Sequence, residues 1–164
     1  MLLSIVMMMK NEEIYLNKTL KALQPLMENI NSELIILDTG STDSSVEIAK
    51  QYTDKVYSAK WNDNFADMRN ISISYASGDW ILILDADEEL TDYDKLKEFF
   101  NSSLCKKYNS ASITLKNILS QDEKVYSISP LIRVFKNYEG FKYEGAIHEQ
   151  PIFKNPIYND IARF

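Results

Sequence analysis

The sequence predicts an α/β fold: a mostly parallel central sheet flanked by helices, with an additional small antiparallel β part in the second half. Through residues 1–90, apolar runs of strand length alternate with segments in which apolar residues recur at helical spacing. In residues 91–164, apolar runs are instead joined by a short polar turn, which favours antiparallel pairing. The 164 residues fit one domain of ordinary size. We therefore expect a single domain, 1–164, with two unlike halves.

Buried strands are expected in the first half, because strands covered on both faces read as continuous apolar runs. These strands are Leu2–Met8, Glu33–Asp38 and Asp79–Leu84, and a short further strand is expected at Lys55–Ser58. Helices should lie between the strands, each beginning near a residue that can cap it. The first runs from an N-cap at Asn11 to about Ile30, the second from Ser41 or Thr42 to about Tyr52, and the third over Phe65–Ala76.

The second half begins with a helix over roughly Asp92–Phe100, after a cap at Thr91. Strand-like runs follow it, the first two joined in a hairpin around the polar turn 120–123. The runs are Ser110–Leu119, Lys124–Ser129, Leu131–Lys136 and Lys142–Ile147. The chain stops at Phe164 without an obvious terminator, which leaves open a truncation of a longer protein.

The composition narrows the classes of partner. The formal charge of −6 argues against nucleic acid, whose partners usually carry a basic stripe. The single cysteine, Cys105, cannot form an internal disulfide and favours a reducing, cytoplasmic compartment. No segment approaches the roughly 20 apolar residues that cross a bilayer, although surface association with a membrane stays open. An acidic protein that binds a phosphate ester would need a divalent cation to neutralise it.

Polar residues gather where the predicted parallel strands end. Lys10–Glu12 follows the first strand, Asp38 ends the second, and Asp85-Ala86-Asp87 follows the fourth. Ligands of such sheets bind at the carboxyl ends of the strands. Asp85 and Asp87 are two residues apart, so their carboxylates would converge and suit a hard cation such as Mg²⁺ or Mn²⁺. The triplet alone is a weak signal, because short motifs match often by chance.

Four blocks, in their order and spacing, make the chain resemble the family 2 glycosyltransferases of GT-A fold. The blocks are Ser4–Glu12, Ile36–Asp43, Phe65–Asn70 with Ala76–Ile81, and Leu84–Glu88. The resemblance implies a nucleotide-diphosphate-sugar donor, a UDP-sugar first of all, with a divalent metal (Mn or Mg) and inversion at the anomeric carbon. It makes 1–90 the nucleotide-binding half and 91–164 the acceptor-side half. The acceptor could be a glycan, a lipid, a peptide or a small molecule.

The resemblance also assigns roles to single residues. Those expected to bind the nucleotide are Lys10, Asn11, Glu12, Asp38, Asp67, Arg69 and Asp85. Arginine suits phosphate because its guanidinium donates two parallel hydrogen bonds. The expected metal ligands are Asp87 first, then Asp85 and His148, the only histidine. The base that takes the acceptor proton is sought among Glu149, Glu88 and Glu89, with Glu149 the first choice.

Three other functions compete with this one. A nucleotidyltransferase would show an early Gly-rich phosphate loop, but the first loop, Lys10–Glu13, has no glycine. A haloacid-dehalogenase-like phosphatase would need a nucleophilic aspartate near the first strand, where Met7–Met9 stands. A catalytically inactive or incomplete nucleotide-sugar-binding module remains, because the four blocks specify binding, whereas a chain of 164 residues is short enough to lack the segment that closes over the acceptor.

Overall fold

The computed structural model describes residues 1–119 and 124–164. The strands are β1 (Leu3–Met9), β2 (Ser32–Asp38), β3 (Val56–Ser58), β4 (Trp80–Asp85), β5 (Ser110–Ile118), β6 (Tyr126–Lys136), β7 (Lys142–Glu144), β8 (Gln150–Ile152) and β9 (Ile157–Tyr158). The helices are α1 (Leu16–Asn29), α2 (Ser45–Ala49), α3 (Phe65–Ser74), α4 (Asp94–Asn101) and α5 (Leu104–Lys107). None of the helices in the described ranges is long and apolar enough to cross a membrane.

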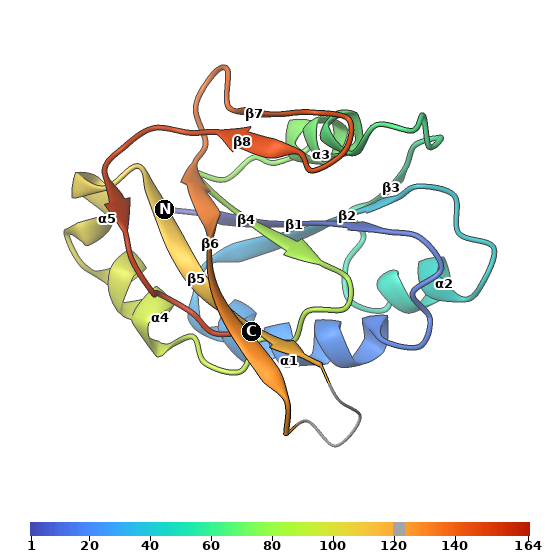
Figure 1. The fold of residues 1–164 in the computed structure, drawn as a ribbon, viewed down its shortest axis with the longest axis horizontal. Helices are drawn as coiled ribbons and strands as arrows, with labels where there is room; N and C mark the ends of the chain where they lie inside the picture. The colour runs from blue at the N-terminus through green and yellow to red at the C-terminus, as the bar shows by residue number, and fades with distance from the viewer. Residues whose placement is uncertain (120–123) are drawn as a thin grey trace.

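The predicted mixed architecture is confirmed. Within the described residues, seven strands form one sheet in the order β3-β2-β1-β4-β6-β5-β9, and β7 and β8 form a separate small sheet (Figure 1). β1 pairs in parallel with β2 and β4, and β2 pairs in parallel with β3. β6 is antiparallel to both β4 and β5. The parallel strands therefore end at one edge of the sheet, as the sequence indicated.

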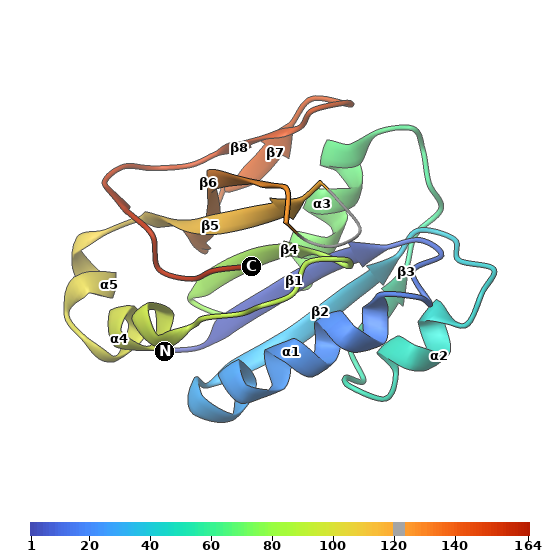
Figure 2. The same cartoon turned by 60° about the horizontal axis from the view of Figure 1, so that its bottom comes forward.

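Two apolar layers cover the sheet. Ile5 and Met7 of β1 pack with α1 and α4 on one face, whereas Val6 packs with α3 and the small sheet on the other. Figure 2 shows these layers, with α1 below the central strands and α3 and β7–β8 above them. Successive strand side chains point to opposite faces, so a continuous apolar run is what a doubly covered strand needs. Each leucine or isoleucine that is fully buried in these layers contributes about 1.5–3 kcal/mol of burial free energy.

The first two helices begin later than predicted. α1 begins at Leu16, so Asn11 is not its N-cap. Asn11 instead adopts a left-handed backbone, with φ of 57°, and its Oδ1 accepts a hydrogen bond from the Thr42 backbone at 2.8 Å. α2 begins after Ser44, and neither Ser41 nor Thr42 caps it. These polar residues therefore join the two loops to each other rather than capping the helices.

The second half keeps the predicted hairpin with different bounds. The runs expected at Lys124–Ser129 and Leu131–Lys136 form one strand, β6, which pairs along the whole length of β5. The predicted turn at 120–123 lies outside the described residues. Thr91 does not cap α4; its backbone N–H donates to the Arg163 carbonyl at 2.8 Å. The strand predicted at Lys142–Ile147 ends at Glu144, because a left-handed glycine, Gly145, follows it.

Candidate active site

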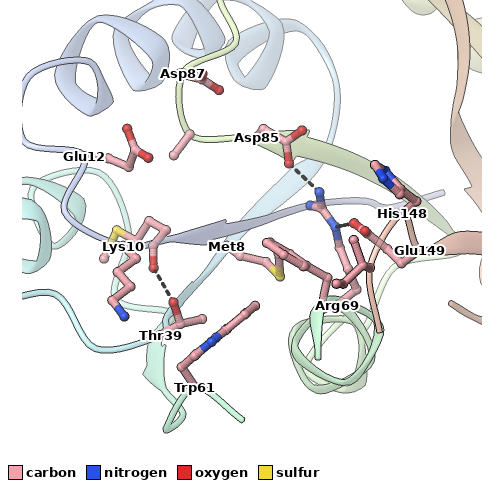
Figure 3. Close-up of a pocket in the computed structure, with 14 residues that line it drawn as sticks. Met8, Lys10, Glu12, Thr39, Trp61, Arg69, Asp85, Asp87, His148 and Glu149 are labelled. Atoms are coloured by element: carbon pink, nitrogen blue, oxygen red, sulfur yellow. Dashed lines mark hydrogen bonds and ion pairs between the residues drawn. The ribbon is translucent and has the colours of Figure 1, made fainter. Parts of the chain in front are cut away.

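Two adjoining pockets open at the carboxyl ends of β1, β2 and β4. The larger has a volume of about 590 Å³ and is lined by Met8, Met9, Lys10, Glu12, Thr39, Trp61, Phe65, Arg69, Asp85, Ala86, Asp87, Ile147, His148 and Glu149 (Figure 3). The smaller has a volume of about 550 Å³ and is lined by Lys10, Asp38, Thr39, Gly40, Ser58, Ala59, Lys60 and Trp61. Because Lys10, Thr39 and Trp61 line both, the two form one cleft.

The loops after β1 and β2 are fastened together beside this cleft. The Asn11 backbone N–H donates to Ser41 Oγ at 2.9 Å, and the Glu12 N–H donates to Ser45 Oγ at 2.7 Å. These bonds hold Lys10 and Glu12 at the pocket wall. Asn11 itself is hydrogen-bonded to the loop after β2 and is not among the residues that line either pocket.

Asp38 lies in the wall of the smaller pocket while it stabilises its own turn. Its carboxylate accepts hydrogen bonds from the backbone N–H groups of Gly40 at 3.3 Å and Ser41 at 3.0 Å. Gly40 has φ of 109°, a conformation that side-chain-bearing residues rarely adopt. Asp38 therefore shapes the loop that borders the pocket and remains within reach of a ligand there.

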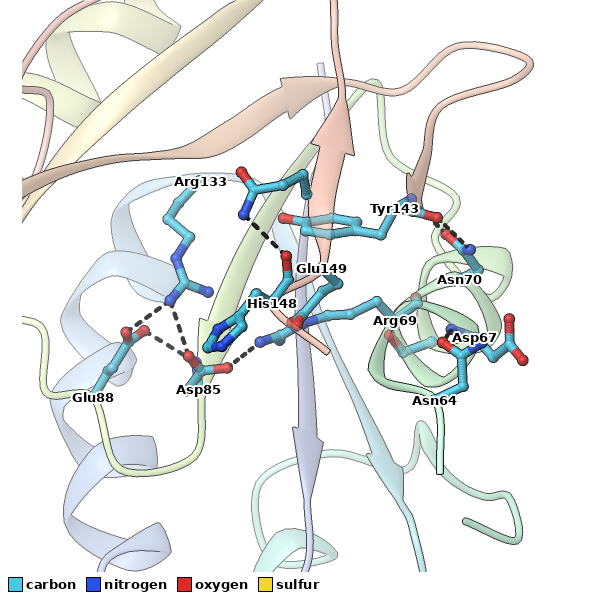
Figure 4. A network of polar contacts seen from close by, with 12 residues as sticks. Asn64, Asp67, Arg69, Asn70, Asp85, Glu88, Arg133, Tyr143, His148 and Glu149 are labelled. Atoms are coloured by element: carbon cyan, nitrogen blue, oxygen red, sulfur yellow. Dashed lines mark hydrogen bonds and ion pairs between the residues drawn. The ribbon is translucent and has the colours of Figure 1, made fainter. Parts of the chain in front are cut away.

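A buried ionic network underlies the larger pocket. Asp85 forms salt bridges with two arginines: Arg69 Nη2 lies 2.5 Å from its Oδ1, and Arg133 Nη2 lies 2.9 Å from its Oδ2 (Figure 4). Burial opposes the charged form of Asp85, but the two arginines outweigh it and lower the pKa of this carboxyl below its ordinary value. Asp85 is therefore an anchor of the network, with both oxygens already engaged.

The two glutamates after Asp87 take different directions. Glu88 is buried, accepts from the Asp85 N–H at 3.0 Å and contacts Arg133 Nη2 at 3.1 Å. Burial raises the pKa of Glu88, and Asp85 and Asp87 add to the rise although Arg133 opposes it. Glu89 instead pairs with Lys18 of α1 at 2.6 Å. Glu88 and Glu89 are two of the three predicted bases, and neither lines the larger pocket.

Glu149 and His148 reach the pocket from the loop between β7 and β8. Glu149 Oε1 accepts from Arg69 Nε at 3.2 Å, and the loop is also tied to α3 by a bond from the Phe65 N–H to the Ala146 carbonyl at 2.9 Å. His148 is exposed at the pocket and has φ of 55°. The structure thus brings Glu149 beside Asp85, although 64 residues separate them in the chain (149 minus 85).

The expected metal ligands do not form a site by themselves. In residues 1–119 and 124–164, no three His, Cys, Asp or Glu side chains lie close enough together to hold a metal ion. In Figure 3, Asp87 and His148 lie on opposite sides of Asp85. Asp87 is exposed at the pocket, and burial together with Asp87 raises the pKa of Glu12. Such an acidic wall fits Mg²⁺ or Mn²⁺, which take one or two protein carboxylates and complete their shell with substrate phosphates and water.

Comparison with known proteins identifies the family. The sequence model described as glycosyl transferase family 2 matches residues 4–104, more than half of the chain. The chain belongs to glycosyl transferase family 2. A TPR repeat-containing protein of Synechococcus elongatus is 34% identical over 146 residues, which are 89% of this chain and 34% of that protein. An uncharacterized glycosyltransferase of Haemophilus influenzae is 39% identical over 109 residues, 63% of this chain and 42% of the relative.

A solved structure shares the fold. A crystal structure of S. aureus TarS, residues 1–349, superposes with a TM-score of 0.60 at 23% identity, covering 74% of this chain and 37% of that one. This likeness confirms the GT-A-like fold expected from the sequence. The chain spans less than half the length of each of these three proteins.

The family 2 match ends before several residues of the site. Arg133, His148 and Glu149 lie beyond residue 104. By resemblance, Arg133 belongs to an Arg-x-Phe segment that precedes the Ile-His-Glu of residues 147–149, but that pattern gives the arginine no contact; an arginine inside an apolar strand is a further signal, because a buried charge needs a partner. Asp67, in contrast, is exposed in the first turn of α3, accepts from Asn62 at 2.8 Å and lines neither pocket.

Proposed function

We propose that this family 2 domain transfers a sugar from a nucleotide-diphosphate-sugar donor, a UDP-sugar first of all, to an acceptor with inversion at the anomeric carbon. The observation that carries the proposal is the two-pocket cleft at the carboxyl ends of β1, β2 and β4. Ligands of open α/β sheets bind at this edge. Structures of TarS in complex with UDP and with UDP-GlcNAc, which share the fold, support this choice of donor.

The cleft offers a separate place for each part of the donor. The smaller pocket, beside Asp38, Gly40 and Trp61, would hold the nucleoside, and the larger would hold the diphosphate and sugar. Arg69 Nη1 is buried and has no hydrogen-bond partner within the described part of the chain. An unmade bond of a buried charged donor is costly, so a phosphate oxygen is a fitting acceptor for it.

A divalent metal fits the acidic wall of the same pocket. Asp87 would be its first protein ligand, with His148 as the second candidate. Asp85 is not proposed as a ligand, because both of its oxygens pair with arginines. When bound, the metal would neutralise the diphosphate and stabilise the departing nucleotide. Lys10 lines both pockets and can add positive charge where they meet.

Glu149 is the residue that we propose as the general base. Inverting transfer requires a base that takes the proton of the acceptor hydroxyl as its oxygen attacks the anomeric carbon, and a carboxylate can serve. Glu149 lines the larger pocket, and the contact with Arg69 Nε fixes its orientation. Glu88 is engaged with Arg133, and Glu89 pairs with Lys18, so neither presents a carboxylate to the pocket.

The proposal is tested by calorimetry of UDP binding with and without Mn²⁺. We compare the native chain with Asp87→Ala and with a matched control, Asp67→Ala, which removes an exposed acid outside the cleft. The native chain and the control should bind UDP more tightly with Mn²⁺, and Asp87→Ala should lose most of that gain.

Three outcomes separate the alternatives. Equal binding by Asp87→Ala and the native chain would remove Asp87 from the metal site. No binding of UDP or of other nucleotides by the native chain, under any metal condition, would refute the donor site. Binding without hydrolysis or transfer of any UDP-sugar would instead favour the inactive or incomplete binding module.

A further inference from the structure

The turn that carries Asp87 into the cleft is closed by its own residues. The Glu88 backbone N–H donates to the Asp85 carbonyl at 3.2 Å, and the Asp85 N–H donates to Glu88 Oε2 at 3.0 Å. These two bonds fold Asp85–Glu88 into a small loop at the end of β4, with Ala86 and Asp87 at its tip lining the pocket. The position of Asp87 therefore depends on how this loop is held against the rest of the protein.

Arg133 is the residue that holds this loop to the hairpin of the second half. Its Nη2 contacts Asp85 Oδ2 at 2.9 Å and Glu88 Oε1 at 3.1 Å, so one guanidinium joins both ends of the loop (Figure 4). The side chain is 15% exposed. Few solvent molecules can replace these contacts, and a charge-assisted bond is strong in such surroundings.

A β-bulge aims Arg133 at the loop. Along the hairpin, Ala111 pairs with Val134 and Ser112 with Ile132, so Arg133 is the extra residue that has no partner in the β5 register. Bulges next to active sites re-aim a side chain that regular pairing would point elsewhere. Val134 and Phe135, which follow, pair with Leu82 and Ile81 of β4 and are fully buried, so the backbone beside the bulge is firmly placed.

We propose that Arg133 is a positioning residue that couples the β5–β6 hairpin to the Asp85–Glu88 loop and thereby sets Asp87 for metal-dependent donor binding. This inference rests on the proposed function and adds a residue beyond the part of the chain that the family model matches. Without the guanidinium, Asp85 and Glu88 would be two neighbouring carboxylates with Arg69 as their remaining cation. Their repulsion would open the loop and displace Asp87.

The test compares UDP binding with and without Mn²⁺ in the native chain, Arg133→Gln and Lys136→Gln. Lys136 stands on the same strand, contacts Asn109 and the Trp80 ring away from the cleft, and its replacement removes the same charge. Arg133→Gln should weaken Mn²⁺-dependent binding about 10- to 100-fold, the usual effect of losing an outer partner of a metal site. Its metal-free binding, and both affinities of Lys136→Gln, should stay within about twofold of native, as for distant surface changes.

A second replacement separates positioning from general loss of structure. The double variant Arg133→Gln, Glu88→Gln removes one of the two repelling charges, so it should recover part of the Mn²⁺-dependent affinity. A merely structural role for Arg133 would lower metal-free and Mn²⁺-dependent binding together and would show no recovery.

The outcomes are distinct. If the native chain binds UDP and Arg133→Gln binds it equally well with Mn²⁺, the proposal for Arg133 is overturned while the donor site stands. If the native chain binds no nucleotide, the proposed function itself fails, and the role of Arg133 fails with it. Should Arg133→Gln not fold, Arg133→Met, which keeps a long unbranched side chain for packing but carries no charge, replaces it. Unchanged Mn²⁺-dependent affinity in that variant would equally overturn the proposal.

Discussion

Glu33 holds the amino-terminal edge of the sheet together, opposite the cleft, and Glu33→Gln is therefore expected to lower stability without affecting the site. Its carboxylate accepts from Ser4 Oγ at 2.5 Å, from the Ser77 N–H at 2.8 Å and Oγ at 2.9 Å, and it pairs with Lys55. The residue is 9% exposed. These contacts join β1, β2, the segment before β3 and the turn before β4 through one side chain.

The magnitude follows from the pKa of the carboxyl. Burial alone would raise it, but Lys55, Ser4 and Ser77 outweigh burial and lower the pKa of Glu33 from 4.5 to about 2. By linkage, a shift of this size corresponds to at most about 3 kcal/mol of folding free energy, because solvent screens the half-exposed Lys55 partner. Because the folded-state pKa is depressed, this contribution is fully present above the unfolded value of 4.5 and is lost as the pH falls from there towards 2.

Urea unfolding at a series of pH values measures this directly. The native free energy of unfolding should fall steeply through the window set by these two pKa values. Glu33→Gln should be less stable near neutral pH, by up to about 3 kcal/mol, with a shallower slope below pH 4.5. Glu47→Gln, which changes an exposed acid of α2, is the matched control and should resemble native. A native-like pH slope in Glu33→Gln would refute the reasoning.

Two further predictions concern the two edges of the sheet. Gly78→Ala should destabilise the fold by about 1–3 kcal/mol, because a Cβ there would lie 2.7 Å from the Leu2 carbonyl oxygen and the backbone has no room to yield; thermal unfolding checks this, and an unchanged midpoint would contradict it. Glu149→Gln should lower the turnover of a UDP-sugar by about 100-fold or more while UDP affinity stays near native, as expected for loss of a general base. Steady-state kinetics measures the turnover and calorimetry the affinity. Equal turnover in the two proteins would exclude Glu149 as the base.

The sequence predicted the parallel half of the fold well and the loops poorly. Continuous apolar runs leave few alternatives to buried strands, so β1, β2 and β4 were placed within about a residue of their bounds, the usual uncertainty of element ends. Asn11 was assigned as a helix cap because capping residues and loop residues share the same composition. Its actual partner is Thr42, in a different loop, and a contact of that range leaves no local pattern.

Only part of the candidate site could likewise be predicted from the sequence. Parallel strands bring their ends together, so the gathering of Lys10, Glu12 and Asp87 around one pocket followed from topology. The pairing of Asp85 with Arg133 did not, because it depends on an antiparallel register and a bulge 48 residues further along the chain. The spacing of residues along the chain also does not predict that the Glu88 side chain is buried and accepts a hydrogen bond from the Asp85 N–H.

The central claim is that a nucleotide binds in the cleft at the carboxyl edge of the sheet, and the two tryptophans test its position most directly. Trp61 lines both pockets, whereas Trp80 is buried against Phe99 and Phe100 on the far side of the sheet from α3. The measurement is a titration of ¹⁵N-labelled protein with UDP and Mg²⁺, followed through the two indole N–H signals. We predict that the Trp61 signal shifts with UDP concentration and saturates while the Trp80 signal stays in place. Saturable binding that leaves Trp61 unmoved would contradict the account.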